Sequence, residues 1–383
     1  FRRDWKACWW SPDARHRAFL ISDTSAVPEC VIVDDSVEPQ RIERTRYPKP
    51  GQANPRVGVG IVSCAGGPVR KVDLSAYDPG AYLIGMIGWQ SDGGSLRIGV
   101  MNRTQTWLDV LRVDPSTGGS AKLFRETTEA WVDPPADVNA HEGVWSSGPR
   151  DLEDGGFLWL SDRDGWRHIY RYDEAGTPAR RVTEGDYDIR GVHRVDQESG
   201  DIYFTAVTGD ATETHLYRVA LPGEGEAPSP PQRITAQPGS HRISMAPGGD
   251  LFIDRWSSID EPPRVALRTR SGALVRMIDT NPVFELERFE LPAIDRVRVR
   301  SGRGTAEEPI FLEGTLVTPT GFDPEAEHPV WFMTYAGPSA PTVRNSFRGG
   351  RLRERLLAEE GIVVFRADPY SAKIGRASCR ERV

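Results

Sequence analysis

Short apolar stretches alternate with polar turns through the first 290 residues, and one such unit recurs five times. In each copy, an apolar strand is followed by a turn that contains glycine and then by a second strand. The equivalent positions, spaced by 51, 59, 47 and 50 residues, are Val62, Val113, Tyr172, Val219 and Thr269. A repeat of this length that is built from strands is typical of the four-stranded blades of a β-propeller.

A second unit precedes several of these copies and consists of an aromatic or apolar residue, a polar turn and a strand. Its turns lie at Trp10–Asp13, Trp89–Gly93, Asp154–Gly156 and Ala246–Gly249. Together the two units predict about five blades. A β-sandwich also pairs its strands, but it does not require self-similarity at a fixed long period. The sequence has no Trp-Asp dipeptide, which disfavours the WD40 kind of propeller.

The pattern changes near Leu291. Residues 313–317 predict one strand, whereas 330–335 and 362–365 are nearly unbroken apolar runs, which predict strands buried on both faces. Between them, three leucines at 352, 356 and 357 have the spacing of one helix face, and Gly361 stands where a helix-ending glycine belongs. Strand, helix and strand in this order indicate the beginning of an α/β domain.

Composition agrees with many short strands joined by tight turns, since the chain has 38 glycines and 30 prolines. The net charge of −7 argues against nucleic-acid binding. Basic residues are almost all arginine, spread along the chain, which we interpret as GC-rich coding and not as arginine-based recognition. The four cysteines (Cys8, Cys30, Cys64 and Cys379) form no C-x-x-C pair, and either one disulfide among the first three or free core cysteines would fit.

The last eleven residues, KIGRASCRERV, back-translate codon by codon into a common sequencing-adapter read. We therefore interpret residues 373–383 as an artefact of cloning or assembly and leave them out of the fold prediction. Ser378 and Cys379 are accordingly not candidates for catalysis.

Several short motifs occur in a fixed order: Trp9–Asp13, Tyr47–Lys49 with Asn54-Pro55, Asp164–His168, Trp256–Ser258 with Pro262-Pro263, His328–Val330 and Tyr335–Pro338. This series resembles the dipeptidyl-peptidase IV family of prolyl oligopeptidase-type serine peptidases. The resemblance implies a mainly β chain in which part of an eight-bladed propeller (1–290) precedes the start of an α/β-hydrolase peptidase domain (291–372). It also implies a serine peptidase that releases N-terminal dipeptides, Xaa-Pro or Xaa-Ala.

The resemblance leaves one site residue in this chain. Relatives carry a tyrosine hydroxyl at the oxyanion site, before Gly-Pro, and Tyr335 matches it; a tyrosine simply packed at a strand end is the alternative. The glutamate pair that binds the substrate amine precedes Trp-Trp-Ser-Pro in relatives, so we expect it upstream of Phe1. No G-x-S-x-G pentapeptide occurs, and the nearest, Gly337–Pro341, ends in proline. We therefore expect the Ser, Asp and His triad beyond residue 372, and an inactive fragment.

The remaining expectations concern partners and alternatives. The family implies peptide substrates with a free N-terminus and no cofactor; the seven histidines show no metal-binding spacing, and no membrane segment is predicted in this piece. A homodimer of the full-length protein is left open, as is the compartment, whether bacterial periplasmic, secreted or cytoplasmic. We predict that His168 is a turn residue and not a base. We also predict that Trp131 and Val132 belong to the propeller core, with a place in the substrate pocket as the alternative. A prolyl-oligopeptidase or acylaminoacyl-peptidase relative, or a non-catalytic binding scaffold, are the other interpretations.

Overall fold

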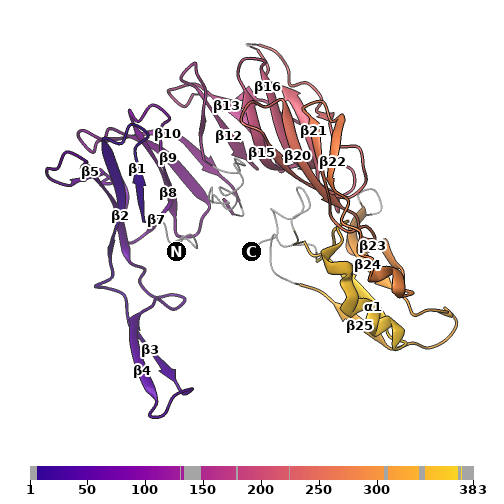
Figure 1. Ribbon diagram of the computed structural model, residues 1–383. Coiled ribbons are helices and arrows are strands. Elements are labelled where there is room, and N and C mark those ends of the chain that lie inside the picture. The colour runs from indigo at the N-terminus through magenta and orange to yellow at the C-terminus, as the bar shows by residue number, and fades with distance from the viewer. Residues whose placement is uncertain are drawn as a thin grey trace. The chain divides into compact units, whose positions relative to one another are not determined.

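The computed structural model describes residues 7–129, 131–132, 148–177, 180–223, 225–305, 309–335, 341–369 and 372. The chain divides into two compact units, residues 1–136 with 173–178 and residues 137–172 with 179–383. Almost all of the regular structure is β (Figure 1).

The first unit contains two four-stranded antiparallel sheets. The first sheet is β1 (Cys8–Trp10), β2 (His16–Asp23), β5 (Arg56–Ser63) and β6 (Arg70–Lys71). The second is β7 (Tyr82–Trp89), β8 (Leu96–Asn102), β9 (Trp107–Val113) and β10 (Ser120–Thr127). Their apolar faces form one core that joins Trp9, Ala18 and Ile61 to Leu96 and Ile98, each buried.

A hairpin between β2 and β5 forms a separate two-stranded sheet, β3 (Glu29–Asp34) and β4 (Arg41–Arg46). It projects away from the sheet that β2 and β5 build (Figure 1). The side chains of Val31, Ile32 and Val33 are exposed on it. The five-copy repeat did not predict this insertion, because the hairpin has no counterpart in the other copies.

The second unit contains three further four-stranded antiparallel sheets. The first is β11 (Arg150–Asp151), β12 (Phe157–Ser161), β13 (His168–Tyr172) and β14 (Arg180–Arg181). The next is β15 (Asp188–Asp196), β16 (Asp201–Val207), β17 (His215–Ala220) and β18 (Gln232–Arg233). The last is β19 (Ser240–Met245), β20 (Leu251–Ser257), β21 (Arg264–Thr269) and β22 (Leu274–Asp279).

These five sheets confirm the predicted partial propeller. The five equivalent positions of the repeat all lie in the third strand of a sheet, in β5, β9, β13, β17 and β21. The second recurrent unit is the turn between the first and second strands of four of the sheets. Within the second unit the first strands β15 and β19 contact each other, as the inner strands of neighbouring blades do.

The glycine of the repeat has a packing role between successive sheets. Gly118, in the turn after β9, has φ +80°, and a Cβ there would lie 2.5 Å from the carbonyl oxygen of Lys71 in the preceding sheet. Gly272, in the turn after β21, has φ +92°, and a Cβ would lie 2.6 Å from the carbonyl oxygen of Ile234. Each turn therefore requires glycine for its backbone angle and for the close approach of the neighbouring strand.

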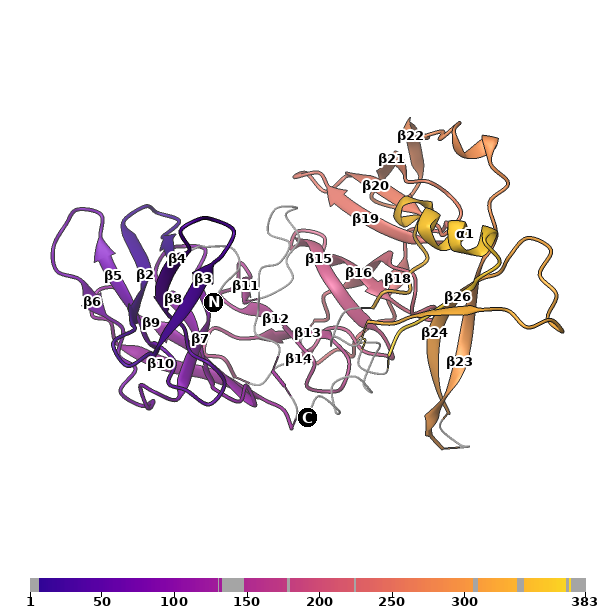
Figure 2. The same cartoon turned by 90° about the horizontal axis from the view of Figure 1, so that it is seen from below.

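After β22 the chain builds a mixed sheet in the order β23 (Ile294–Gly304), β24 (Pro309–Val317), β26 (Val363–Ala367) and β25 (Val330–Met333). Only β25 and β26 run parallel. The helix α1 (Leu352–Glu359) lies against β24 and β26 (Figure 2). The described residues also form two 3₁₀ turns, η2 (Leu286–Arg288) and η3 (Arg348–Arg351). Gly361, at φ +82°, ends α1 as predicted.

Two expectations about burial are wrong here. The apolar run of β25 is exposed, with Val330 62% and Phe332 59% accessible, because β25 is the outermost strand among the described residues of this sheet. In α1, Leu352 and Leu356 are exposed, and Glu354, Arg355 and Ala358 are buried instead. Glu354 turns inward because its carboxylate is paired with the guanidinium groups of Arg351 and Arg366.

The limits 1–290 and 291–372 remain predictions, as does the assignment of the mixed sheet to an α/β hydrolase. Residues 373–383, which include Ser378 and Cys379, lie outside the described residues.

Candidate functional site

Tyr335 lies two residues beyond the carboxyl end of β25. This strand runs parallel to β26, with Met333 paired to Arg366 at its last position. The carboxyl ends of parallel strands are where α/β sheets carry their ligand sites. The side chain of Tyr335 is 55% exposed among the described residues. The role of Tyr335 stays a prediction. Ser339, the serine of the Gly337–Pro341 pentapeptide, lies outside the described residues.

His168 is the first residue of strand β13, and not a turn residue as the sequence analysis predicted. Its side chain is buried, with Nδ1 3.1 Å from the hydroxyl of Thr183 and Nε2 2.9 Å from the carbonyl oxygen of Gly185. Burial lowers the pKa of this imidazole. Both ring nitrogens are thus occupied by local partners, which leaves neither available as a base.

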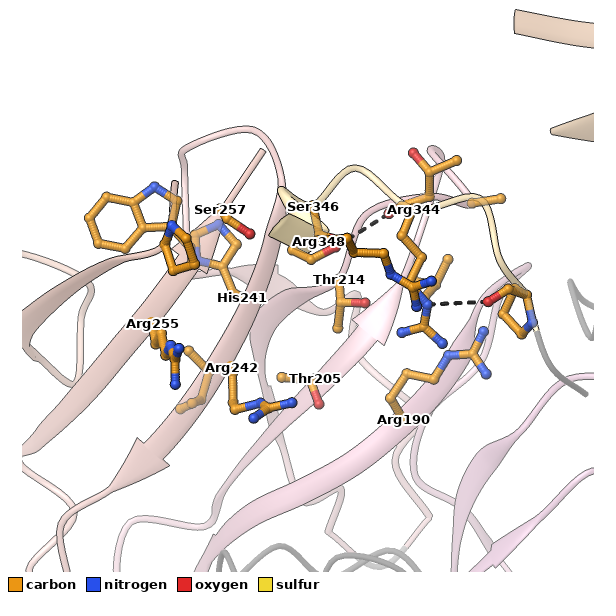
Figure 3. A pocket seen from close by; sticks show the side chains of 18 of the residues that line it. Arg190, Thr205, Thr214, His241, Arg242, Arg255, Ser257, Arg344, Ser346 and Arg348 are labelled. Carbon is orange, nitrogen blue, oxygen red and sulfur yellow. Dashed lines mark hydrogen bonds between the residues drawn. The ribbon is translucent and has the colours of Figure 1, made fainter. Parts of the chain in front are cut away.

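A cavity of about 610 Å³ lies in the second unit, between two neighbouring sheets and the segment 341–348 (Figure 3). Residues of β15, β16, β19 and β20 form much of its wall. Five of the side chains that line it are arginines: Arg190, Arg242, Arg255, Arg344 and Arg348. We call this feature the arginine cavity.

The arginine side chains give the wall of the arginine cavity an excess of positive groups. Among the described residues that line it there is no aspartate or glutamate. Burial lowers the pKa of the Arg190 guanidinium. Burial, followed by the charges of Arg348 and Arg190, lowers the pKa of Arg344, with Asp368 opposing this. Burial also lowers the pKa of His193, on the same wall, to about 4, so this imidazole is neutral at pH 7.

The segment 341–348 is held to the sheets by buried hydrogen bonds. Asn345, 3% exposed, donates from Nδ2 to the carboxylate of Glu213 at 2.6 Å and accepts the backbone N–H of Ile259 at 2.8 Å. Asp368 accepts the backbone N–H groups of Thr342 and Val343. These bonds fix the backbone on both sides of Arg344.

A buried network of charges lies behind one wall of the cavity. His241, which lines the cavity, is hydrogen bonded through Nδ1 to Asp254 at 2.8 Å, and Asp254 also accepts from Arg268 at 3.0 Å. The ring of His241 lies 4.9 Å from that of His215, whose Nε2 is 2.9 Å from the carboxylate of Glu213. Burial would raise the pKa of Glu213, but hydrogen bonds from His215 and Asn345 outweigh it and hold the pKa at about 2.

Sequence reasoning missed the arginine cavity, because it interpreted the arginines as scattered. They are scattered in sequence, from 190 to 348, and only the packing of neighbouring sheets brings them together. Trp131, expected in the core, is 42% exposed. The free-cysteine alternative holds for Cys8, Cys30 and Cys64, but none of the three is fully buried.

No group of three or more His, Cys, Asp or Glu side chains in the part of the chain that the structure describes is placed to hold a metal ion. None of the helices described there is long and apolar enough to span a membrane.

Comparisons with known proteins agree on one family. Residues 3–263 match the family described as the dipeptidyl peptidase IV N-terminal region. The "Probable dipeptidyl peptidase 4" of Emericella nidulans is 26% identical over 348 residues, 88% of this chain and 44% of that protein. The "Dipeptidyl peptidase 4" of Arthroderma otae is 25% identical over 359 residues, 89% of this chain and 44% of that protein.

A solved structure gives the same fold. The crystal structure of Porphyromonas gingivalis dipeptidyl peptidase 4 has a TM-score of 0.81 with this chain at 23% identity, covering 95% of this chain and 49% of that one. The chain thus spans about half the length of the relatives it matches. With a family match over most of its length and five four-stranded sheets in the order the repeat predicts, the chain belongs to the dipeptidyl peptidase IV N-terminal region family.

Proposed function

We propose that the full-length protein is a serine-type peptidase that releases N-terminal dipeptides, Xaa-Pro or Xaa-Ala, from peptides with a free amino terminus. The observation that carries this proposal is the family match over residues 3–263. The names of the relatives and the agreement of the fold support it.

The proposal assigns one chemical role to this chain. Tyr335, exposed beyond the carboxyl end of β25, donates its hydroxyl to the oxyanion that forms when the scissile carbonyl is attacked. The mixed sheet of β23 to β26 with α1 is then the start of the hydrolase domain. Since the sequence has no G-x-S-x-G pentapeptide, the nucleophile comes from another part of the protein and this chain alone is inactive. Assembly as a homodimer is proposed on family resemblance alone.

The test compares blocked and unblocked substrates. The full-length protein is given Gly-Pro-p-nitroanilide and its N-acetylated form, and release of nitroaniline is followed. Hydrolysis of the unblocked substrate only, abolished by a serine-directed reagent, supports the proposal. Equal hydrolysis of both would instead indicate a prolyl-oligopeptidase or acylaminoacyl-peptidase activity, and hydrolysis of neither would indicate a binding scaffold.

A further inference from the structure

The arginine cavity gathers five positive side chains from separate parts of the second unit. Arg190 lies on β15, Arg242 on β19 and Arg255 on β20, whereas Arg344 and Arg348 come from the segment 341–348 and η3. The charges of Arg348 and Arg190 both act on Arg344, and Figure 3 labels all three on the wall of the cavity. Like charges held in one partly enclosed space repel each other unless an opposite charge joins them.

Neither Arg344 nor Arg348 is paired with a carboxylate in the described part of the chain. Arg344 Nε contacts the carbonyl oxygen of Pro341, and Arg348 Nη1 that of Thr342, each at the long distance of 3.5 Å. The nearby carboxylate of Asp368 instead accepts two backbone N–H groups and the hydroxyl of Thr342. A guanidinium group has five N–H donors, so both arginines retain capacity for a ligand.

The pKa of Arg344 is lowered in this environment. Burial and the charges of Arg348 and Arg190 disfavour its protonated form, and Asp368 offsets this only in part. A bound anion would lie against several guanidinium groups at once and relieve this repulsion. Guanidinium groups bind carboxylates and phosphates through paired, charge-assisted hydrogen bonds.

Other residues of the wall favour a peptide over a simple inorganic ion. The hydroxyl-bearing residues Thr205, Thr214 and Ser257 line the cavity together with the arginines. A volume of about 610 Å³ accommodates several residues of an extended peptide. An inorganic phosphate would occupy only a small part of this space and would reach only some of the arginines.

We propose that the arginine cavity binds the acidic side chains of a peptide, and so selects peptides that carry carboxylates. That the ligand is a peptide rests on the proposed function; that it is anionic rests on the cavity itself. Arg344 and Arg348 make the principal contacts in this assignment, because neither is paired with a carboxylate among the described residues and both lie on a backbone fixed by Asn345 and Asp368.

The experiment measures binding and not turnover, so it does not depend on peptidase activity. The full chain is titrated by calorimetry with the amidated hexapeptide Gly-Pro-Glu-Gly-Glu-Gly, with the same peptide carrying glutamine for glutamate, with the N-acetylated form of each, and with inorganic phosphate. The test variant is a double variant that combines Arg344→Gln with Arg348→Gln. The matched control is Arg15→Gln, which replaces an exposed arginine of the first unit. Circular dichroism checks that each variant is folded, and Arg255→Gln is a second single variant on the same wall.

The expected result is that the glutamate peptide binds at least tenfold more tightly than the glutamine peptide, with or without the acetyl group. The double variant should lose this preference, Arg255→Gln should reduce it, Arg15→Gln should keep it, and raising NaCl from 50 to 500 mM should weaken it. Equal affinity for both peptides, a preference that survives both cavity variants, or binding of phosphate alone would overturn the proposal. A glutamate preference in a protein that cleaves no dipeptide would leave this inference standing and overturn only the proposed function.

Discussion

Asn345 is the residue whose replacement should most clearly weaken the attachment of the segment 341–348. It is 3% exposed, its amide nitrogen is 2.6 Å from a Glu213 carboxylate oxygen, and its amide oxygen is 2.8 Å from the backbone nitrogen of Ile259. Asn345→Leu keeps the size of the side chain and removes both bonds. Glu213 then loses one of its neutral donors, and the N–H of Ile259 is left buried without its partner.

The two losses can be added as an order of magnitude. A hydrogen bond to a charged group contributes about 1.5–3 kcal/mol, and a buried donor left unsatisfied costs about 1–3 kcal/mol. The variant should therefore lose about 2.5–6 kcal/mol of unfolding free energy. With a urea dependence of about 2–3 kcal/mol per molar, this lowers the urea midpoint by about 1–3 M.

Urea unfolding of the full chain, followed by tryptophan fluorescence, measures this shift. Gln40→Leu is the control, since Gln40 is an amide side chain exposed on the first unit, and it should change the free energy by less than about 0.5 kcal/mol. If Asn345→Leu behaves like Gln40→Leu, the hydrogen bonds to Glu213 and Ile259 do not hold this segment, and the account of how Arg344 is positioned is wrong.

Three further predictions follow from the fold and the site. Gly272→Ala should lower the unfolding free energy, measured in urea, by about 1–3 kcal/mol more than Gly66→Ala does. Both glycines have φ near +92°, but only at Gly272 would a Cβ lie 2.6 Å from a backbone carbonyl oxygen. Equal losses in the two variants would contradict the packing role of Gly272. The pKa of His193 is about 4 in the folded chain, against 6.5 for an unperturbed imidazole, so the unfolded chain binds more protons between pH 4 and 6.5. The urea midpoint should therefore be lower at pH 5 than at pH 7, and His193→Gln should make this difference smaller. An unchanged difference in the variant would show that His193 does not contribute to it. In the full-length enzyme, Tyr335→Phe should lower kcat by about 10²-fold or more with little change in KM, and an unchanged kcat would exclude the oxyanion role.

The sequence predicted the elements whose pattern is local. Third strands such as β9 and β17, the helix near Leu352 and its terminal Gly361 all follow from short-range spacing. The β3–β4 hairpin was not predicted because it occurs once, and a repeat pattern identifies only segments that recur.

The burial of individual side chains and the position of the arginine cavity could not be predicted from the sequence, because both depend on long-range packing. Val330 and Leu356 are apolar and yet exposed, whereas Glu354 is buried because Arg351 and Arg366 pair with it. No spacing rule joins Arg190 to Arg344, since they meet only when the 341–348 segment lies against the strands of two sheets. Tyr335 could be selected only through the family resemblance.

The most direct test of the account is to identify what the full-length protein removes from a peptide. An unblocked decapeptide with proline at positions 2 and 4 is incubated with it, and the products are followed by mass spectrometry. We expect successive losses of intact Xaa-Pro dipeptides from the amino end, and none from the acetylated peptide. Release of single amino acids, internal cleavage, or an intact decapeptide would contradict the assignment.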